Sequence, residues 1–578
     1  MNLVIRFFLC VVAPLPLLTA GMVFAQAAVM QDSATQEPTT RSPEQLRGEI
    51  TPERAWWDLL HYDLAVEVFP ESKSIKGLNQ VKFRVLAKAT RMQIDLQPPL
   101  KIQSVTHKQQ TLKFMREGNV YWIDFPKALP VGSTEVIEIK YGGQPVEATN
   151  PPWEGGVTWK KDEQGNHFIA TACQGLGASS WWPSKDHGSD EPDQGVRVRA
   201  TVPDNLKAVS NGRLTGQTHS QKDKTRTFQW EVKNPINNYA VSLNIGNYVH
   251  FADKFDGEAG TLDVDYWVLK GQAERAKAHF KEVPRTIKAF EHWFGKYPFY
   301  EDSYKLVVVP YTGMEHQSAV TYGNFFANGY RGRDLSKTGV GLKFDFIIVH
   351  ESGHEWFGNS LTSQDIADMW IHESFTNYSE TLFIGYHFTQ KEANDYVIGC
   401  RDLIENDKPI IGKYNLHQKG SSSDMYYKGG NMLHTIRQIV NDDEKFRGIL
   451  RGLNKTFFHQ IITTEQVENY LSKQSGVDLS SLFDQYLRHT QIPNLVIGFE
   501  ERKITYQFED CIDSLCFPVK LNVNGKATWI KPTVTQQSIE TEVDVKELTV
   551  DRNFYLRSSV NGEPSNESNS EDADDDVK

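Results

Sequence analysis

The run His350-Glu-Ser-Gly-His354, followed after eighteen residues by Glu373, constrains the fold of this chain more than any other feature. Residues four apart lie on one face of a helix, so the two imidazoles can converge on a single cation. Glu373 begins a second helical stretch, residues 373–385, so we expect two helices to pack around one metal ion. Three protein ligands leave one position of the ion open, which is typical of catalytic zinc. Glu351, one position along from the first histidine, then faces that open position.

The residues around the histidines favour a helix. Residues 346–357 are mostly apolar, and Gly358 is placed as a C-terminal stop. Gly353 is unfavourable inside a helix by about 1 kcal/mol, which a close approach of another backbone would explain. Glu380 lies seven residues after Glu373 on the same helical face. Its carboxylate is placed to accept the remaining ring N–H of a ligating histidine, which would fix the tautomer of that ring.

Three further segments carry polar side chains near the ends of predicted elements. A β-rich stretch, residues 304–309, runs into Gly313-Met314-Glu315-His316. Gln174 precedes a Trp-Trp-Pro-Ser-Lys-Asp turn at residues 181–186. Tyr426 and Tyr427 precede Lys428-Gly-Gly. These segments come from different parts of the chain, so only the fold can bring them together.

The metal motif and these segments together resemble the gluzincin M1 aminopeptidases, a family that includes leukotriene hydrolase. The resemblance implies that Glu315 pairs with the free α-ammonium group of a peptide. A charge-assisted hydrogen bond of this kind is about twice as strong as a neutral one. Gly313, Met314 and His316 would line the cleft beside it. Gln174 would be the second contact to the amino terminus, through its amide oxygen.

The resemblance also implies a zinc-dependent mechanism. One Zn²⁺ per chain would be held by His350, His354 and Glu373. Zinc lowers the pKa of water, and Glu351 would act as the general base and then protonate the leaving amine. Tyr426 would donate to the oxygen of the scissile carbonyl, although Tyr427 is an alternative for this role. The predicted substrates are peptides with a free amino terminus.

Two alternatives remain open at this stage. A zinc endopeptidase is disfavoured because Glu315 and Gln174 would be left unpaired by an internal peptide segment. A catalytically inactive, peptide-binding homologue is disfavoured because it needs neither Glu351 nor Tyr426. Epoxide hydrolysis is less expected, since the Asp that leukotriene hydrolases place eight residues before the tyrosine is Gln418 here.

The sequence departs from the family at two histidines. His316 stands where the family usually has Asn, and His372 precedes Glu373 where Asn is common. Both rings titrate near neutral pH in the absence of other influences. The pH optimum and the substrate preference of better-known members are therefore not transferred to this chain.

The composition of the two ends of the chain predicts a targeting segment at the N-terminus and a solubilising segment at the C-terminus. Arg6 precedes an apolar run, residues 7–24, and small residues follow at Ala25 and Ala27. We expect residues 1–25 to be a removable signal peptide rather than a membrane anchor, and the mature protein to be periplasmic or secreted, without stable membrane association. Residues 559–578 are acidic and poor in apolar side chains, so disorder is expected. A formal net charge of −12 argues against nucleic acid as a partner.

The spacing of apolar residues predicts an α+β multidomain chain. Residues 26–53 read as a linker, residues 54–250 as an all-β sandwich or saddle, residues 251–491 as a mostly helical, thermolysin-like catalytic domain, and residues 492–558 as a small β-unit. Cys511 and Cys516 flank four residues between two β-like runs, which suggests a disulfide. Cys173 and Cys400 are expected to be free and buried.

Overall fold

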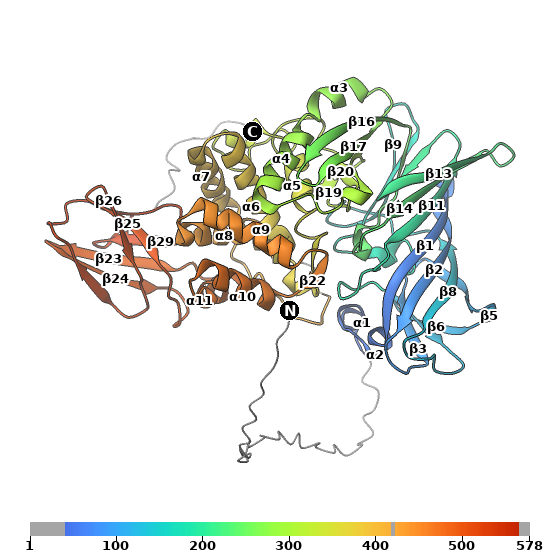
Figure 1. Cartoon of the computed structure of the whole chain (residues 1–578), viewed down its shortest axis with the longest axis horizontal. Coiled ribbons are helices and arrows are strands. Elements are labelled where there is room, and N and C mark those ends of the chain that lie inside the picture. The colour runs from blue at the N-terminus through green and yellow to red at the C-terminus, as the bar shows by residue number, and fades with distance from the viewer. Residues whose placement is uncertain (1–40, 418–421, 566–578) are drawn as a thin grey trace, which may run out of the picture. The chain divides into compact units, whose positions relative to one another are not determined.

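The computed structural model describes residues 41–417 and 422–565. The described residues from Ser42 onward belong to one compact unit. The predicted signal peptide, the tail from residue 566 and Gln418 lie outside the described residues. Figure 1 shows the helices labelled α6, α8 and α9 between the strands β1, β2 and β8 and the strands β23 and β24.

The linker prediction is wrong for its last part, because residues 42–55 are folded. Helix α1, Pro43–Gly48, begins with a capping box in which Ser42 and Gln45 each bind the other's backbone N–H. Helix α2, Pro52–Ala55, is capped by Thr51. Arg54 is fully buried, and its Nη2 lies 2.7 Å from Asp95 Oδ2. A buried guanidinium needs such a partner, so this segment is part of the β-domain.

Apart from α1 and α2, the N-terminal domain is built of strands, as predicted. Its main sheet has the strand order β13-β14-β11-β1-β2-β8-β4-β5, with β1 parallel to β11 and the other pairs antiparallel. Two smaller sheets, β12-β15-β10-β9 and β3-β7-β6, complete the domain. The strand bounds are β1 Trp57–Phe69, β2 Ser74–Val85, β3 Arg91–Asp95, β4 Lys101–His107, β5 Gln110–Thr111, β6 Lys113–Glu117, β7 Val120–Asp124, β8 Thr134–Gly143, β9 Gly156–Lys161, β10 His167–Ala172, β11 Val196–Pro203, β12 Lys207–Val209, β13 Arg213–Ser220, β14 Thr225–Val232 and β15 Asn244–Gly246.

Alternating burial explains why these residues form a sandwich. In β1 the side chains of Tyr62, Leu64 and Val66 are buried, and those between them are partly exposed. Trp56, Trp57 and Phe83 meet edge to face inside the domain, with ring centroids 5.7–5.8 Å apart. Each large ring removes apolar surface from water, which is the main force that closes the sandwich.

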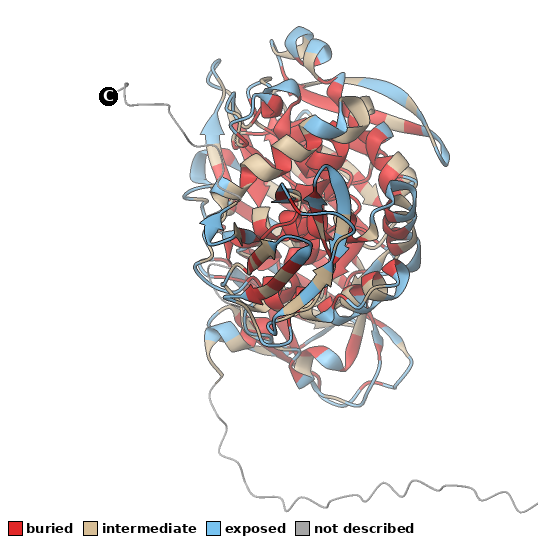
Figure 2. Cartoon of the chain, turned by 90° about the vertical axis from the view of Figure 1, so that its left-hand side faces the viewer, coloured by how far each residue is buried: buried red, intermediate tan, exposed pale blue. Residues whose placement is uncertain are grey.

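The catalytic domain combines a mixed sheet with helices. The predicted boundary at residue 250 falls inside strand β16, which pairs with β17 in the sheet β16-β17-β18-β20-β19, so the domain begins earlier than predicted. Its elements are β16 Tyr248–Gly257, β17 Gly260–Leu269, α3 Ala273–His279, α4 Glu282–Phe294, β18 Tyr304–Val308, β19 Gly313–Met314, β20 Val320–Tyr322, α5 Phe346–Gly353, β21 Leu361–Ser363, α6 Trp370–His387, α7 Gln390–Gly399, α8 Tyr427–Val440, α9 Asp443–Thr456, β22 Gln460–Ile462, α10 Thr464–Ser475 and α11 Ser480–Arg488. Figure 2 shows that buried residues, drawn in red, fill the interior of the molecule.

The C-terminal β-unit follows α11, as predicted, but extends further. It contains the sheets β27-β24-β23-β29-β30 and β26-β25-β28. The predicted tail starts too early, because β29 pairs with β23 through Val560. The strands are β23 Asn494–Glu500, β24 Lys503–Glu509, β25 Val519–Val523, β26 Lys526–Ile530, β27 Gln537–Glu540, β28 Leu548–Val550, β29 Arg557–Val560 and β30 Glu563–Pro564.

The suggested disulfide is not formed, since Cys511 and Cys516 are free thiols. The loop between them is held by hydrogen bonds to α11 instead. The backbone N–H of Cys516 donates to Ser481 Oγ, and the N–H of Ile512 donates to Gln485 Oε1. Cys173 and Cys400 are free and buried, as predicted. Across the described ranges, 41–417 and 422–565, no helix combines the length and the hydropathy needed to cross a bilayer.

Candidate active site

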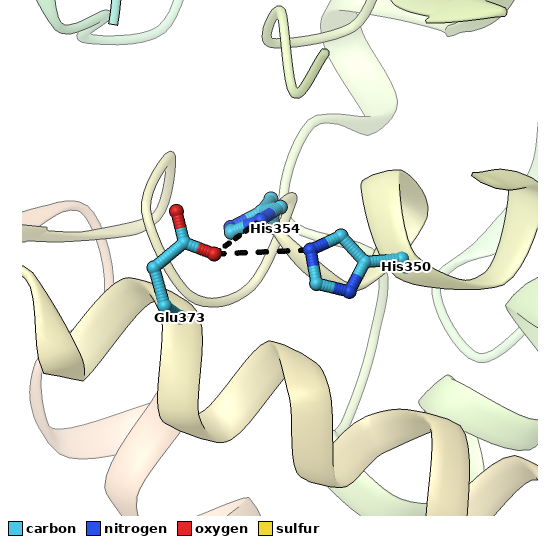
Figure 3. Close-up of side chains that lie close together, drawn as sticks. All are labelled: His350, His354 and Glu373. Carbon is cyan, nitrogen blue, oxygen red and sulfur yellow. Dashed lines mark ion pairs between the residues drawn. The ribbon is translucent and has the colours of Figure 1, made fainter. Parts of the chain in front are cut away.

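The three predicted metal ligands come together at the contact between α5 and α6 (Figure 3). Glu373 Oε2 lies 3.7 Å from His350 Nε2 and 3.4 Å from His354 Nε2. All three residues are at least 94% buried. The two helices therefore present two imidazoles and one carboxylate to a single point, as the spacing of the motif predicts.

Helix α5 is fixed at both of its ends. Asp345 caps its start by accepting the N–H of Ile348, and the same buried carboxylate accepts a hydrogen bond from Tyr322. The helix ends at Gly353, not near Gly358 as expected. A Cβ on Gly353 would lie 2.7 Å from Ser379 Oγ, so the absent side chain allows α5 and α6 to approach closely. His354 follows as the C-terminal cap, still with helical backbone angles.

Hydrogen bonds fix the tautomer of both histidines. His350 Nδ1 lies 2.7 Å from Glu380 Oε1, and His354 Nδ1 lies 2.9 Å from the carbonyl oxygen of Phe357. Both oxygens only accept, so each Nδ1 carries the proton and each Nε2 has a free lone pair. Glu380 thus makes the contact predicted for it. Its other oxygen accepts from Tyr396, which holds the carboxylate in place.

The donor set fits a zinc ion. Glu373 Oε2 is buried and has no hydrogen-bond partner among the described residues, which is costly unless a cation is bound. The ligand atoms of His350, His354 and Glu373 lie within 4.8 Å of one another. Two imidazole nitrogens and one carboxylate oxygen form a set typical of catalytic zinc. Burial would raise the pKa of Glu373, but the adjacent histidines lower it well below its ordinary range.

Glu351 faces the same cavity as the ligands. Its carboxylate lies within 4.8 Å of ligand atoms of both Glu315 and His354. Burial raises the pKa of Glu351 to about 8, and the charge of Glu315 acts in the same direction. The residue predicted as the general base is thus beside the metal position, in a site that favours its uptake of a proton.

The Gly313-Met-Glu-His segment forms the edge of the catalytic sheet. Strand β19 is the last strand of its sheet, next to β20, and Gly313, Met314 and Glu315 line the cavity. Glu315 is buried and its Oε1 has no hydrogen-bond partner among the described residues. Burial raises its pKa, as does the charge of Glu373. An ammonium group could supply the partner that this carboxylate lacks.

His316 does not line this cavity. It is fully buried, and burial lowers its pKa to about 3. His372 is also buried: Ser363 N–H donates to its Nε2, and burial with the charge of His354 lowers its pKa to about 3. Both rings are neutral at ordinary pH. The predicted substrate contact of His316 is therefore wrong, because the fold encloses its ring away from the cavity.

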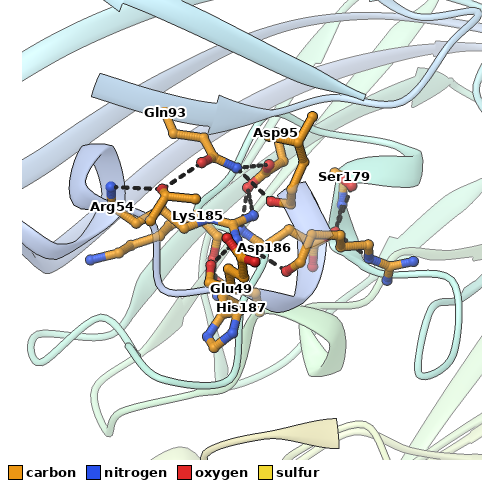
Figure 4. Close-up of polar contacts among 12 residues, drawn as sticks. Glu49, Arg54, Gln93, Asp95, Ser179, Lys185, Asp186 and His187 are labelled. Atoms are coloured by element: carbon orange, nitrogen blue, oxygen red, sulfur yellow. Dashed lines mark hydrogen bonds and ion pairs between the residues drawn. The ribbon is translucent and has the colours of Figure 1, made fainter. Parts of the chain in front are cut away.

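Gln174 reaches the metal site from the β-domain. Its Nε2 donates to Glu373 Oε1 over 2.8 Å, which leaves its amide oxygen available in the cavity. The loop that carries it is held by a buried polar network (Figure 4). Arg54 binds Asp95, Asp95 accepts the N–H of Asp186, and the carboxylate of Asp186 accepts from the backbone and hydroxyl of Ser179.

Both tyrosines of the 426–427 pair line the cavity, but they lie among different groups. The ring of Tyr426 is 6.1 Å from that of His350. Burial raises the pKa of Tyr426, as do the charges of the site carboxylates Glu373, Glu315 and Glu351. Burial also raises the pKa of Tyr427, and there the charge of Glu380 acts in the same direction. The geometry therefore favours Tyr426 as the donor to a reacting carbonyl.

The cavity itself has a volume of about 340 Å³ and a wall of mixed character. Its carboxylates and histidines gather at the metal position. The rest of the wall is largely apolar or aromatic and includes Tyr330, Leu335, Phe346 and Ile347. No Lys or Arg is among the described residues that line it. The site can thus hold a cationic end of a molecule together with an apolar side chain.

Sequence reasoning missed several residues that position the site. Glu355 is buried and accepts from Ser318 N–H and from Tyr297, which ties the end of α5 to the loop after Glu315. Asn359 donates to the carbonyl oxygen of Glu315. Tyr239 lies near Glu315 and Glu373, and burial together with these charges raises its pKa. These partners come from distant segments, and no motif spacing marks them.

This architecture is that of a zinc metallopeptidase, and comparisons with known proteins agree. The Peptidase M1 N-terminal domain model matches residues 59–240, and the Peptidase family M1 domain model matches residues 278–486. The chain therefore belongs to peptidase family M1, whose metal is zinc, which confirms the resemblance seen in the sequence.

Individual relatives are distant. Leucyl aminopeptidase of Saccharolobus solfataricus is 22% identical over 73% of this chain and 54% of its own length. Leukotriene A-4 hydrolase of Xenopus laevis is 23% identical over 61% of this chain and 57% of its own length. The chain thus spans about half the length of these relatives.

Solved structures share the fold. The M1 zinc metallopeptidase from Deinococcus radiodurans matches with a TM-score of 0.64 and 21% identity, over 76% of this chain and 95% of that one. A mutant of that protein has been solved with a Tyr-Ser-Ala substrate. The predicted α+β fold class is thereby confirmed.

Proposed function

We propose that this protein is a zinc aminopeptidase that releases the first residue of peptides with a free amino terminus. One observation carries the proposal. Glu315, a buried carboxylate with an unpartnered oxygen, lies on the wall of the same cavity as the metal ligands and Glu351. A positive chain end can neutralise that carboxylate, whereas an internal peptide segment cannot.

The chemistry follows from the residues around the metal position. Zinc, when bound by His350, His354 and Glu373, supplies Lewis acidity that polarises a carbonyl and acidifies water. Glu351 accepts the proton of the attacking water and passes it to the leaving amine. Tyr426 donates to the oxygen that gains negative charge in the transition state.

Glu315 and Gln174 set where the chain is cut. The carboxylate of Glu315 binds the α-ammonium group, and the amide oxygen of Gln174 accepts a second hydrogen bond from it. Because β19 is an edge strand, the substrate backbone can pair with it as an added strand. Fixing the terminus at Glu315 leaves only the first peptide bond within reach of Glu351.

Hydrolysis of leucine p-nitroanilide tests this proposal, since the apolar cavity wall suits a leucine side chain. We expect release of p-nitroaniline by the zinc-loaded protein, loss of activity with a chelator and recovery when zinc is restored. Absence of hydrolysis of this and other aminoacyl anilides by the zinc-loaded protein would exclude the proposal.

We also propose that the protein is exported, on the strength of the signal-like residues 1–25. Expression of the full chain in a bacterial host, followed by mass spectrometry of its N-terminus, tests this. The mature chain is expected to begin just after Ala25 or Ala27. A cytoplasmic product that retains Met1 would contradict it.

A further inference from the structure

A second cavity adjoins the active site and differs from it in charge. It has a volume of about 570 Å³ and shares Trp153 and Thr312 with the wall of the first cavity. Four cations and two acids line it: Lys160, Lys161, Arg275, Arg331, Asp162 and Glu163. The carboxylate of Asp162 already accepts from the N–H groups of Gln164 and Asn166 in its own turn. Cations therefore dominate this second cavity.

The order of residues 310–315, which include β19, indicates which part of a substrate enters the second cavity. Glu315 would bind the amino terminus, and a Cβ on Gly313 would lie 3.0 Å from Glu351 Oε1, so the reacting bond lies beside Gly313. A peptide that starts at Glu315 and is cut beside Gly313 must continue past Thr312. Thr312 lies in the walls of both cavities, and Tyr311 and Pro310 line the second. The leaving part of the peptide thus runs into the second cavity.

Three of the cations that line the second cavity are available to a ligand. In the part of the chain that the structure describes, Arg275, Arg331 and Lys160 have no carboxylate partner. Arg275 instead donates to the carbonyl oxygen of Phe325, Lys160 donates to that of Pro310, and Arg331 lies over the Phe325 ring. Each retains N–H groups that can bind an anion.

The backbone beside Arg331 is held in an unusual conformation. Phe325, Phe326 and Arg331 have φ values of 58°, 54° and 54°, a region that costs a non-glycine residue about 1 kcal/mol or more. Phe325 is also 59% exposed, and Trp153, which lines the same cavity, is 60% exposed. Strained backbone and exposed aromatic side chains are common at binding sites.

We infer that this second cavity binds a carboxylate on the third or fourth residue of the substrate. From Glu315 the chain can span at most about 11 Å to Thr312 and about 18 Å to Pro310, which an extended substrate covers with about three to five residues. The carboxylate can be the C-terminus of a short peptide or an acidic side chain. This inference rests on the proposed aminopeptidase function and names its substrate class: short peptides with a negative charge two or three residues beyond the cleaved bond.

Matched peptide pairs test the inference. One pair, Leu-Gly-Gly as the free acid and as the C-terminal amide, tests the terminal carboxylate. A second pair, Leu-Gly-Glu-Gly-amide and Leu-Gly-Gln-Gly-amide, tests the side chain. We expect kcat/KM to be about 5- to 30-fold higher for the charged member of at least one pair. The pair that responds identifies the source of the carboxylate.

The double variant Arg275→Gln, Arg331→Gln is expected to reduce the preference for the charged peptide to less than about twofold. The control is Lys222→Gln, an exposed change in the turn between β13 and β14, and it is expected to retain the preference. Equal rates for both members of both pairs in the wild type would overturn the inference, as would a preference that persists in the double variant. Hydrolysis of leucine p-nitroanilide by the wild type, measured alongside, shows separately whether the aminopeptidase proposal holds.

Discussion

At the scale of single residues, the role and the protonation state of each side chain in the site depend on the groups that surround it. Helical geometry alone places His350 and His354 on one face, and the resemblance to the family's motif spacing predicted Glu373 as the third ligand. The neutral state of His316 and His372 was not predictable, since it arises from burial by segments far away in the chain. The same holds for Tyr239 and Glu355, whose roles depend only on tertiary contacts.

Replacing Glu351 by Gln is expected to lower kcat by several orders of magnitude, because the amide cannot accept a proton. The zinc ligands are unchanged, so zinc content per chain should stay near that of the wild type. Steady-state kinetics and elemental analysis of the same preparation check both statements. Turnover close to the wild-type value would place the general base elsewhere.

Replacing Glu380 by Gln is expected to weaken zinc binding by about 10- to 100-fold. The carboxylate accepts from His350 Nδ1, and an amide oxygen is a weaker acceptor that makes the ring a poorer ligand. Competition with a chelator measures the affinity. Glu274→Gln, an exposed change on α3, is the control. Equal affinities for the wild type and Glu380→Gln would contradict the role of this contact.

At the scale of elements, close packing of α8 on α6 positions Tyr426. Ser374 donates to the carbonyl oxygen of Met425, directly before the tyrosine. A Cβ on Gly429 would lie 1.8 Å from Ser374 Oγ, and one on Gly430 would lie 2.2 Å from Asn377 Oδ1. Both glycines lie in the first turn of α8, where the structure shows that side chains of α6 occupy the space a Cβ would need.

Gly429→Ala is therefore expected to displace α8 and to lower both the stability and kcat, the latter by tenfold or more. Gly448→Ala is the matched control, because a Cβ there, within α9, meets nothing within 4 Å. This control should be stabilised by about 0.5–1 kcal/mol, since alanine favours a helix. Denaturant unfolding and kinetics of both variants measure these effects. A Gly429→Ala protein as stable and active as the wild type would show that the contact is not required.

At the scale of the whole molecule, residues 42–53, the described part of the predicted linker, belong to the fold. His187 links them to it: its Nε2 lies 3.0 Å from the carbonyl oxygen of Gly48, and its Nδ1 accepts the N–H of Ser189. Their polar composition suggested a linker, whereas in the structure Ser42 and Gln45 form a capping box that begins α1. The all-β, helical and second β-regions were predictable from periodicity, whereas the boundaries at residues 250 and 559 were not, because strand pairing fixes them.

The buried position of His187 should make the free energy of unfolding decrease as the pH is lowered. Burial lowers the pKa of His187 to about 4, and the charge of Arg54 acts in the same direction. Between about pH 6.5 and pH 4 the unfolded chain binds a proton that the folded chain does not, so the free energy of unfolding decreases as pH falls. The shift corresponds to about 3 kcal/mol. Unfolding of the wild type and of His187→Gln across this range measures the difference. The variant should lose less stability, and parallel curves would contradict the assignment.

The central claim is that the metal site faces a groove that recognises a free amino terminus. The most direct test compares hydrolysis of one tripeptide, Leu-Gly-Gly, with that of its N-acetylated form by the zinc-loaded protein. We predict release of leucine from the free peptide and no detectable cleavage of the acetylated one, because Glu315 then has no ammonium group to bind. Equal rates of cleavage for the two peptides would contradict the account.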